Sequence, residues 1–341
     1  MRRLFYSIII FSLFLASCTM PEVEKRNVYF VSVALDYREH VCTNDDNKVV
    51  LNATTHDQYG MIRELLALDD SLNAKLFLGS NGDRYVLSTD EGSTSPSTAK
   101  RKTALDVLPY KIEAWNSESV LASIDAIAQK AKPDDLFIFQ YSGHGDMNAG
   151  ELVLAIEDNG SVHKVTDFIS SNMLLSHVEQ LKCPSILIVD SCYSGNFVKY
   201  NTLGSGNLFQ GIKSRTTFER LKQISLIQAA TESFSILTNE NEKKLPDIYV
   251  FAAATSKQTS WDSDNGIWPT ETKPEDKYGG FTYYILKSMG YDPINDEPHN
   301  TGKTITLYTL FDDTWKEMRK NHRAYATPTI TLSPLDIVLF N

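Results

Sequence analysis

The sequence has few cysteines, no run of basic residues and no long hydrophobic segment. Lys and Arg number 33 against 43 Asp and Glu, which gives a net charge of −10. Nucleic-acid phosphates are held mainly by clustered Lys and Arg, so this balance excludes general nucleic-acid binding. No internal repeat of about 20 to 50 residues is visible, so a repeat architecture is not expected.

The composition is that of a soluble globular protein. Apolar residues make up 42% and charged residues 22% of the 341 positions, enough to build a substantial core. A chain of this length is long for one compact domain, although α/β folds with insertions reach it. We expect one large domain, with at most a small appendage.

The first twenty residues have the order of an export signal. Arg2 and Arg3 precede an apolar run from Leu4 to about Ala16, and small residues follow. The run is too short for a comfortable membrane-spanning helix. Residues 1–17 are therefore predicted to be a signal peptide and no part of the fold.

The stretch Leu15-Ala16-Ser17-Cys18 resembles the bacterial lipoprotein signal. That resemblance implies that Cys18 is lipidated, that residues 18–27 form a tether, and that the exported chain is anchored to the cell envelope without spanning a membrane. Thr19 stands where an aspartate would favour inner-membrane retention, so the outer membrane of a diderm cell is favoured. A plain signal peptide and an uncleaved apolar anchor remain alternatives.

Without Cys18, three cysteines are left: Cys42, Cys183 and Cys192. Because three is odd, at least one thiol stays free in an exported protein unless it pairs between chains. We expect Cys42 and Cys183 to be structural, either free or paired with each other. If Cys192 is the thiol that stays unpaired in an oxidising compartment, its presence needs a functional explanation.

Apolar strands alternate with amphipathic helices along the chain, which predicts a parallel sheet with helices on both faces. The expected central strands are 28–35, 74–79, 136–139 and 185–190, and the helices between them are 57–70, 119–131 and 171–182. Residues 82–102 are expected to form a surface loop or small hairpin, and 151–156 a hairpin strand. Of the strand-like segments 224–230 and 248–254, only one is expected in the main sheet. Two helices at 281–289 and 307–318 and two strands at 328–332 and 336–340 complete the prediction.

Two short motifs follow two of the buried strands. The first, Ser142-Gly143-His144-Gly145, comes after one strand, and Asp190-Ser191-Cys192-Tyr193-Ser194-Gly195 comes after the next long one. Ligands bind beyond the carboxyl ends of parallel strands, so neighbouring strands would bring His144 and Cys192 to one edge. A thiol attacks an amide efficiently only with help, and an imidazole can take its proton.

Together, "YSGHG" and "DSCYSG" resemble the motifs of the caspase-like cysteine peptidases, the clan of caspases, metacaspases, clostripain and gingipains. The metacaspase and bacterial caspase-like branch is the most similar. The resemblance runs from Val28 to the C-terminus, so it implies a three-layer α/β caspase-like domain over 28–341. It also implies that His144 is the general acid/base and Cys192 the nucleophile, with backbone N–H groups of Gly145 and Cys192 for the oxyanion.

The same resemblance implies a specificity pocket that accepts a basic side chain. Branches that cleave after basic residues line this pocket with acids, and the matching positions are Asp57 and Asp190, with Asp262 as a further candidate. An Arg or Lys at P1 would form charge-assisted hydrogen bonds there. Asp57 and Asp190 also have a structural interpretation, because an aspartate at a helix start often caps that helix and one at a strand end often caps the loop or helix that follows.

Some positions depart from the family pattern. His56 stands where the family usually has Asn, and Asp146 follows Gly145, where it could serve the pocket, a metal or the turn. Residues 196–247 fit poorly and are predicted to be an insertion. A processing site could lie there at Lys199, Lys213 or Arg215. Calcium is a possible cofactor because some metacaspases need it, although no site can be matched.

The leading hypothesis is thus an envelope-anchored cysteine endopeptidase that cleaves peptides or proteins after Arg or Lys. One alternative is an inactive caspase-like lipoprotein that serves as a binding or scaffolding module. Another is a transpeptidase, in which an amine rather than water resolves the acyl-enzyme. The sequence predicts neither the oligomeric state nor the natural substrate.

Overall fold

The computed structural model describes only part of the chain. The described residues are 26–35, 37, 51, 53–71, 74–78, 83–87, 111–112, 116–146, 151–158, 163–192, 194, 248–254, 260, 278–298, 304–321, 329–330 and 338–340. The predicted signal peptide, Cys18, Cys42, Asp262 and the expected insertion at 196–247 lie outside them. So does most of the predicted tether, whose last two residues open the first strand.

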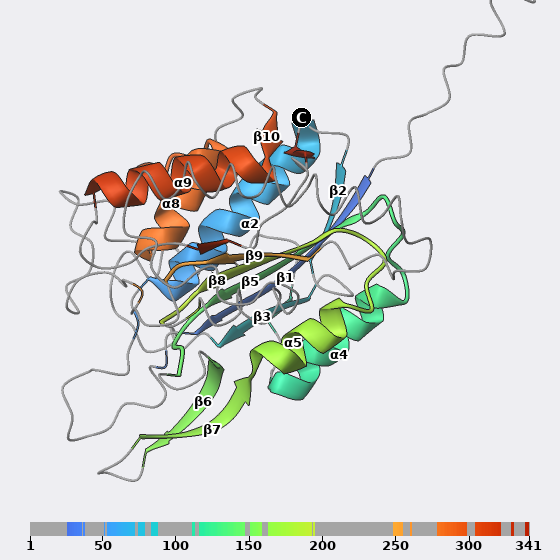
Figure 1. Cartoon of the computed structure of the whole chain (residues 1–341), viewed down its shortest axis with the longest axis vertical. Coiled ribbons are helices and arrows are strands. Elements are labelled where there is room, and N and C mark those ends of the chain that lie inside the picture. Colours follow the sequence, from blue (N-terminus) through green and yellow to red (C-terminus); the bar gives the residue numbers. More distant parts are fainter. Residues whose placement is uncertain are drawn as a thin grey trace, which may run out of the picture.

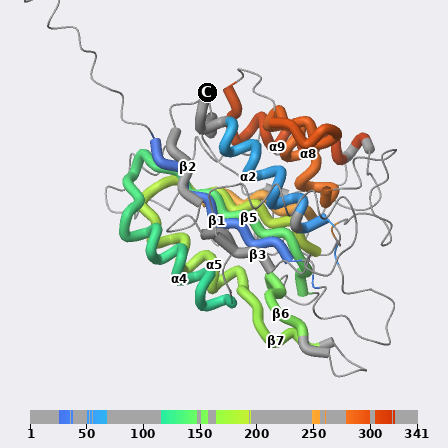
Figure 2. The backbone as a smooth tube through the Cα atoms, turned by 180° about the vertical axis from the view of Figure 1, so that it is seen from behind, coloured from blue at the N-terminus to red at the C-terminus, as the bar shows by residue number. Residues whose placement is uncertain are grey.

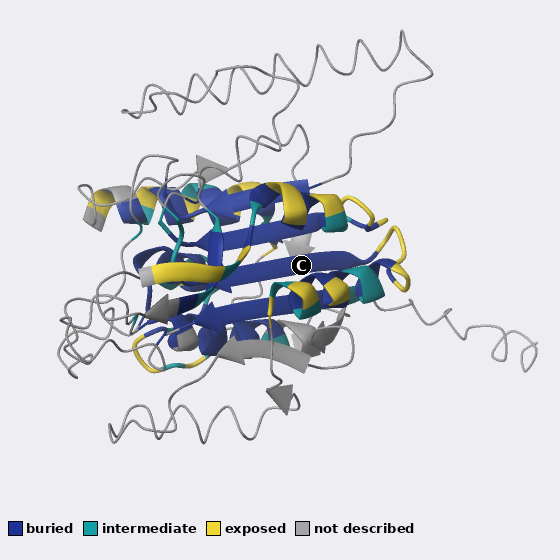
Figure 3. Cartoon of the chain, turned by 90° about the horizontal axis from the view of Figure 1, so that it is seen from below, coloured by how far each residue is buried: buried dark blue, intermediate teal, exposed yellow. Residues whose placement is uncertain are grey.

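Four long parallel strands form the middle of the sheet. They are β1 (Arg26–Leu35), β5 (Leu136–Ser142), β8 (Ser185–Asp190) and β9 (Ile248–Ala252), in the spatial order β9-β8-β5-β1. Every residue of β5, β8 and β9 is buried, as Figure 3 shows in dark blue. Strands covered on both faces need apolar side chains on both, which explains their uninterrupted apolar runs.

Helices cover both faces of the sheet (Figures 1 and 2). One face packs against α2 (Thr54–Ser71), α8 (Gly280–Met289) and α9 (Leu307–Asn321). The opposite face packs against α4 (Ser117–Ala128) and α5 (Ser171–Val178). Successive strand residues alternate between these two cores: Val28 belongs to the first and Tyr29 to the second. The predicted three-layer α/β architecture is confirmed.

Local sequence signals account for several helix ends. Asn116 caps α4 by accepting from the N–H of Ser119 at 2.8 Å, and the Ser119 hydroxyl accepts in return from the N–H of Asn116 at 2.9 Å. Ser170 caps α5 through one hydrogen bond, in which its hydroxyl accepts from the N–H of Met173 at 3.2 Å. Helix α8 ends at Gly290, whose φ of 108° is a conformation that glycine adopts without a steric penalty.

One edge of the sheet differs from the prediction. The first half of β1 pairs with β2 (Ala74–Leu78), and its last residues pair with β3 (Asp83–Leu87), which also pairs with β4 (Lys111–Ile112). The expectation of a loop or small hairpin at 82–102 is therefore wrong for 83–87, which form a parallel strand of the main sheet. Five residues between polar neighbours give little local signal, and their hydrogen bonds come from distant β1.

Three further strand pairings complete the fold. The expected hairpin is confirmed, with β6 (Leu152–Asp158) antiparallel to β7 (His163–Ile169). Strand β11 (Thr329–Ile330) adds to β9 antiparallel, and β10 (Ile305–Thr306) pairs with β12 (Val338–Phe340) in a separate sheet. Among the described residues, no helix is long and apolar enough to cross a membrane.

Candidate active site

The two motif strands lie side by side, as predicted. In the parallel ladder between β5 and β8, Ser142 is the register partner of Asp190. Beyond this pair, the N–H of Gly143 donates to the carbonyl of Asp190 at 3.2 Å. The loop that contains His144 and the loop that contains Cys192 thus leave the same edge of the sheet together.

The two loops touch at Gly145. A Cβ at this position would overlap the carbonyl oxygen of Cys192 and would lie 3.1 Å from the hydroxyl of Ser191. Gly145 also pairs with Leu152 in an antiparallel bridge, which joins the histidine loop to the start of β6. Only glycine allows this approach of one backbone to the other.

Cys192 and Cys183 have contrasting surroundings. Cys192 is partly exposed, whereas Cys183 is buried and free, and burial raises the pKa of the Cys183 thiol to about 11. Because a reactive cysteine must be accessible and must ionise, Cys183 is structural, as expected, and unpaired. Ser194, two positions after Cys192, is buried, and its hydroxyl accepts from the N–H of Ala254 at 3.1 Å. Ala254 lies just beyond the end of β9, so this bond ties the segment after Cys192 to the neighbouring strand.

His144 lies against two tyrosines that the sequence analysis did not single out. The imidazole of His144 packs on the ring of Tyr37, with centroids 4.6 Å apart. The backbone N–H of His144 donates to the Tyr37 hydroxyl at 3.0 Å. The hydroxyl of Tyr141 donates to the carbonyl of His144 at 2.7 Å. Burial raises the pKa of Tyr141 well above its ordinary value, so this hydroxyl keeps its proton.

Asp57 is buried in the first turn of α2. Its carboxylate accepts from the hydroxyl of Ser142 at 2.6 Å and from the N–H of Gly279 at 2.8 Å. The neighbouring side chain, Gln58, donates to the carbonyl and hydroxyl oxygens of Ser32 on β1, which fixes the start of α2 on the sheet. Asp57 therefore lies directly above the end of β5, next to the motif that contains His144.

Asp190 is buried at the end of β8 and is surrounded by hydrogen-bond donors. It accepts from the hydroxyl of Ser260 at 2.7 Å, and from the hydroxyl and N–H of Thr282 at 2.8 and 3.2 Å. Burial raises its pKa, although these donors favour the ionised form. Thr282 lies in the first turn of α8, so Asp190 binds the start of a helix that lies 92 positions further along the chain.

The two acids converge on the start of α8. A Cβ at Gly279 would lie 2.7 Å from one oxygen of Asp190 and 2.9 Å from one oxygen of Asp57. One carboxylate oxygen of Asp190 and one of Asp57 therefore lie close to each other, on either side of this position. The N-terminus of a helix carries partial positive charge, which makes it a favourable place for two buried carboxylates.

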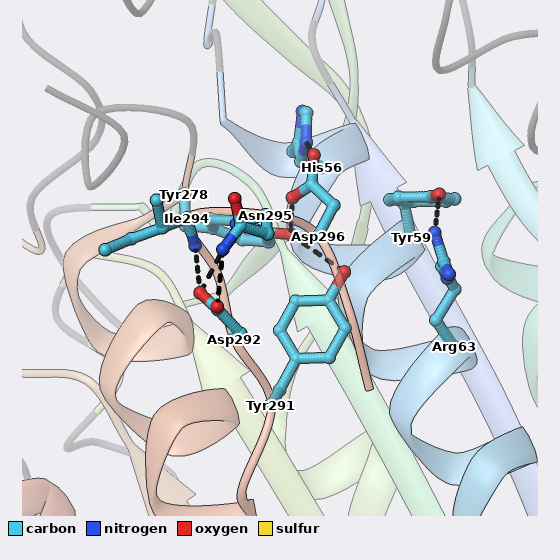
Figure 4. A network of polar contacts seen from close by, with 9 residues as sticks. All are labelled: His56, Tyr59, Arg63, Tyr278, Tyr291, Asp292, Ile294, Asn295 and Asp296. Carbon is cyan, nitrogen blue, oxygen red and sulfur yellow. Dashed lines mark hydrogen bonds and ion pairs between the residues drawn. The ribbon is translucent and has the colours of Figure 1, made fainter. Parts of the chain in front are cut away.

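Tyr278, the residue before Gly279, belongs to a cluster of polar contacts that Figure 4 shows. The hydroxyl of Tyr278 donates to the carboxylate of Asp296 at 2.7 Å, and the same carboxylate lies 3.5 Å from Nε2 of His56. The His56 ring meets that of Tyr278 edge-on, with centroids 4.9 Å apart. His56, the departure from the family pattern, thus contacts the residue that precedes Gly279.

The remaining predicted features are only partly described. The N–H of Asp146 donates to the carbonyl of Glu151 at 3.0 Å, so Asp146 closes the turn into β6. Burial, and secondarily the charge of Asp146, raise the pKa of Glu151. Among the described residues no cluster of three His, Cys, Asp or Glu side chains could hold a metal ion. Asp262 lies outside the described part of the chain.

Sequence reasoning missed the residues that support the predicted ones. Ser142 belongs to the first motif, and Ser260, Gly279 and Thr282 lie 70 or more positions beyond Asp190. A polar residue in a loop or helix gives no local signal that it donates to a distant carboxylate.

The Caspase domain family matches residues 99–336, a range that contains His144 and Cys192 but begins after Asp57. The crystal structure of protein GSU0716 from Geobacter sulfurreducens is 14% identical, with a TM-score of 0.42 and coverage of 93% of this chain and 95% of that chain. The structure of pro-sf-caspase-1 is 11% identical, with a TM-score of 0.40 and coverage of 95% and 100%. No curated protein matches the sequence.

The family match spans more than two thirds of the chain, and the parallel sheet flanked by helices is the fold that this family has. The chain therefore belongs to the Caspase domain family and contains a caspase-family cysteine peptidase domain.

Proposed function

We propose that the protein is a cysteine endopeptidase that cleaves after Arg or Lys, with Cys192 as nucleophile and His144 as general acid/base. The observation that supports this assignment is the pairing of β5 with β8, which brings the two loops to one edge of the sheet. Contact between Gly145 and the Cys192 backbone supports it further.

The reaction follows from the chemistry of these groups. His144 accepts the thiol proton of Cys192, and the thiolate sulfur attacks the scissile carbonyl carbon, whose oxygen becomes an oxyanion. Backbone N–H groups of Gly145 and Cys192 donate to this oxyanion. The C–N bond then breaks, His144 protonates the leaving amine, and a thioester remains. Water, deprotonated by His144, attacks the thioester and releases the acid and the thiol.

The preference for basic residues rests on Asp57 and Asp190. Both are buried at the start of α8, and Asp190 accepts hydrogen bonds from neutral donors, Ser260 and Thr282. A cationic P1 side chain that reaches these acids would add an opposite charge in a site of low dielectric, where it counts more than in water. Asp262 is proposed as a further acid of this pocket.

The decisive experiment is profiling of a peptide library with the wild-type protein and the Cys192→Ala and His144→Ala variants, each with and without calcium. We expect cleavage after Arg and Lys by the wild-type protein and none by Cys192→Ala. Cleavage by Cys192→Ala would refute the assignment of the nucleophile. A folded wild-type protein that neither cleaves nor reacts with an electrophile aimed at P1 Arg would instead support the scaffolding alternative.

We further propose that residues 1–17 are removed and that lipidated Cys18 anchors the mature chain to the cell envelope. The order of charged, apolar and small residues at the N-terminus supports this proposal. Replacing Cys18 with Ser should move the protein from the membrane fraction to the soluble exported fraction. A Cys42→Ser variant is the matched control and should stay with the membrane.

A further inference from the structure

Two buried tyrosines meet beneath the loop that contains His144. Tyr141 lies in β5, and Tyr37 lies two positions beyond the end of β1, the neighbouring strand. Both side chains are fully buried, and their hydroxyl oxygens are 3.0 Å apart. The two residues are 104 positions apart in sequence, and the parallel pairing of β1 with β5 brings them together.

Their hydroxyls satisfy the backbone on both sides of the histidine loop. Tyr37 accepts from the N–H of His144 at 3.0 Å and donates to the carbonyl of Val153 at 2.6 Å. The single hydroxyl hydrogen of Tyr141 is shared between the carbonyl oxygens of His144 and Val153, each 2.7 Å from the Tyr141 hydroxyl oxygen. The N–H and the carbonyl of His144 are thus both bound by a tyrosine hydroxyl, which leaves its backbone little freedom to rotate.

The ring of Tyr37 provides a second contact. It packs on the imidazole of His144 with centroids 4.6 Å apart and an angle of 38° between the planes. Tyr37 adopts a φ of 58°, a conformation that is unusual for a bulky residue. Such strain persists only where surrounding contacts impose it, and here the contacts are those with His144, Tyr141 and Val153.

Gly143 makes room for this arrangement. A Cβ there would lie 2.5 Å from the hydroxyl oxygen of Tyr141 and 2.8 Å from that of Tyr37. The first glycine of the motif therefore lets both hydroxyls approach the loop, whereas the second, Gly145, lets the loop approach Cys192. Each of the two glycines is therefore required by a different close contact.

We propose that Tyr37 and Tyr141 are positioning residues for His144: their hydroxyls fix its backbone, and the Tyr37 ring fixes the plane of its imidazole against Cys192. This inference rests on the proposed peptidase function, because it assigns the tyrosines a role in the reaction of His144. Neither tyrosine touches the substrate in this scheme. Their loss should therefore change the proton transfer and leave substrate affinity almost intact.

The test measures how fast iodoacetamide alkylates Cys192 as a function of pH, in the full-length chain, by mass spectrometry of the peptide that contains Cys192. A thiolate paired with protonated His144 reacts at a pH below the ordinary thiol range, and His144→Ala should abolish this reactivity. We expect Tyr37→Phe and Tyr141→Phe to move the profile toward that of His144→Ala. They should also lower kcat on an Arg peptide about tenfold or more, with KM within about twofold.

Two further variants complete the test. One removes the ring contact of Tyr37 in addition to its hydroxyl, and the other removes the hydroxyl of a tyrosine in the same strand but away from His144. Tyr37→Leu removes the ring contact as well and should lower kcat below that of Tyr37→Phe. Tyr29→Phe is the matched control, because Tyr29 is a buried tyrosine in the same strand β1 but near its opposite end, and it should behave as the wild type. If Tyr37→Leu fails to fold, Tyr37→Phe and Tyr141→Phe still test the positioning role, because both variants keep the volume of the ring.

The outcomes distinguish failure of the positioning role of the two tyrosines from failure of the proposed peptidase function. Wild-type kcat and a wild-type alkylation profile in both Phe variants would overturn the positioning role while leaving the peptidase function intact. A wild-type protein whose profile equals that of His144→Ala, and which cleaves no peptide, would instead refute the proposed function itself. A fall in kcat with an unchanged alkylation profile would also overturn the positioning role, because it would show that the imidazole had not moved relative to the thiol.

Discussion

Gly145 and Cys192 are in direct backbone contact, although they are 47 positions apart in sequence. The contact is so close that any side chain at position 145 would overlap the carbonyl of Cys192. It sets the separation between the histidine loop and the nucleophile loop at the edge of the sheet. The proposed oxyanion donors are the backbone N–H groups of these same two residues.

Replacing Gly145 with Ala should therefore lower kcat/KM on an Arg peptide by about 100-fold or more, because a displacement of about 1 Å is enough for such a loss. The measurement is steady-state hydrolysis, with thermal unfolding followed in parallel to identify the folded fraction. Wild-type kcat/KM in Gly145→Ala would show that the two loops can separate without cost. That result would contradict the proposed oxyanion site.

Replacing Asp190 with Asn should reduce cleavage after Arg by roughly 10- to 100-fold in kcat/KM, the size of a lost hydrogen bond to a charged group. Asn can keep the local contacts: its oxygen can face Thr282, and its amide can donate to the hydroxyl of Ser260, which can reverse its direction. A peptide with an uncharged P1 residue is the control substrate. Equal losses on both peptides would indicate that Asp190 has only a structural role.

The same variant should alter the pH dependence of stability. Burial raises the pKa of Asp190 above its ordinary value of 3.8, so the folded protein holds this proton more tightly than the unfolded chain. The stability that Asp190 contributes is therefore fully present below that ordinary pKa and is lost as pH rises through the raised one. Asp190→Asn lacks this loss, so its Tm relative to the wild type should increase from acidic to neutral pH. A constant or falling difference would contradict the raised pKa.

Gly279 offers a test of the pocket that leaves both acids in place. A Cβ there would push on Asp57 and Asp190 together, at 2.9 and 2.7 Å from their oxygens. Gly279→Ala should raise KM for an Arg peptide several-fold more than it lowers kcat, since Cys192 and His144 are not displaced. Asp57→Asn provides a comparison in which one charge is removed without added volume. A change in kcat alone would place the effect at the reacting groups rather than in the pocket.

Tyr278 should matter mainly for stability. Its hydroxyl donates to the carboxylate of Asp296 at 2.7 Å in a partly buried setting, so Tyr278→Phe removes a donor to a partly buried carboxylate. The expected loss is about 1 to 3 kcal/mol in the free energy of unfolding, measured with denaturant. Tyr308→Phe is the control, because that side chain lies on α9 and is exposed. Equal stabilities of the two variants would show that the cluster of Figure 4 contributes nothing measurable.

The sequence predicts the centre of this fold well because the physics there is local. Strands such as β5 and β8 are buried on both faces, so their unbroken apolar runs are visible in the sequence, and each run ends at a polar motif. The expectation that His144 and Cys192 leave the same edge required only that these two strands be neighbours. The register pair Ser142 and Asp190 confirms it.

The edges of the sheet and the support of the site could not be predicted in this way. Strand β3 is short and lies between polar residues, so its pairing with β1 and β4 defines it. Tyr37 ends the stretch "SVALDY", in which nothing indicates a partner 104 positions away. Asp57 and Asp190 were expected in one pocket from the resemblance alone. Their meeting at Gly279 depends on where α8 begins, which no local pattern specifies.

The order of the strands also has a consequence for how the protein folds. The site draws on Tyr37 after β1, His144 after β5, Cys192 after β8 and Thr282 in α8, so no continuous fragment shorter than most of the chain contains it. Contacts between residues so distant in sequence form slowly, because loop closure must precede them. Peptidase activity should thus return late in refolding, after helical circular dichroism has recovered. A partly synthesised chain would remain an inert precursor until its C-terminal third had joined the sheet.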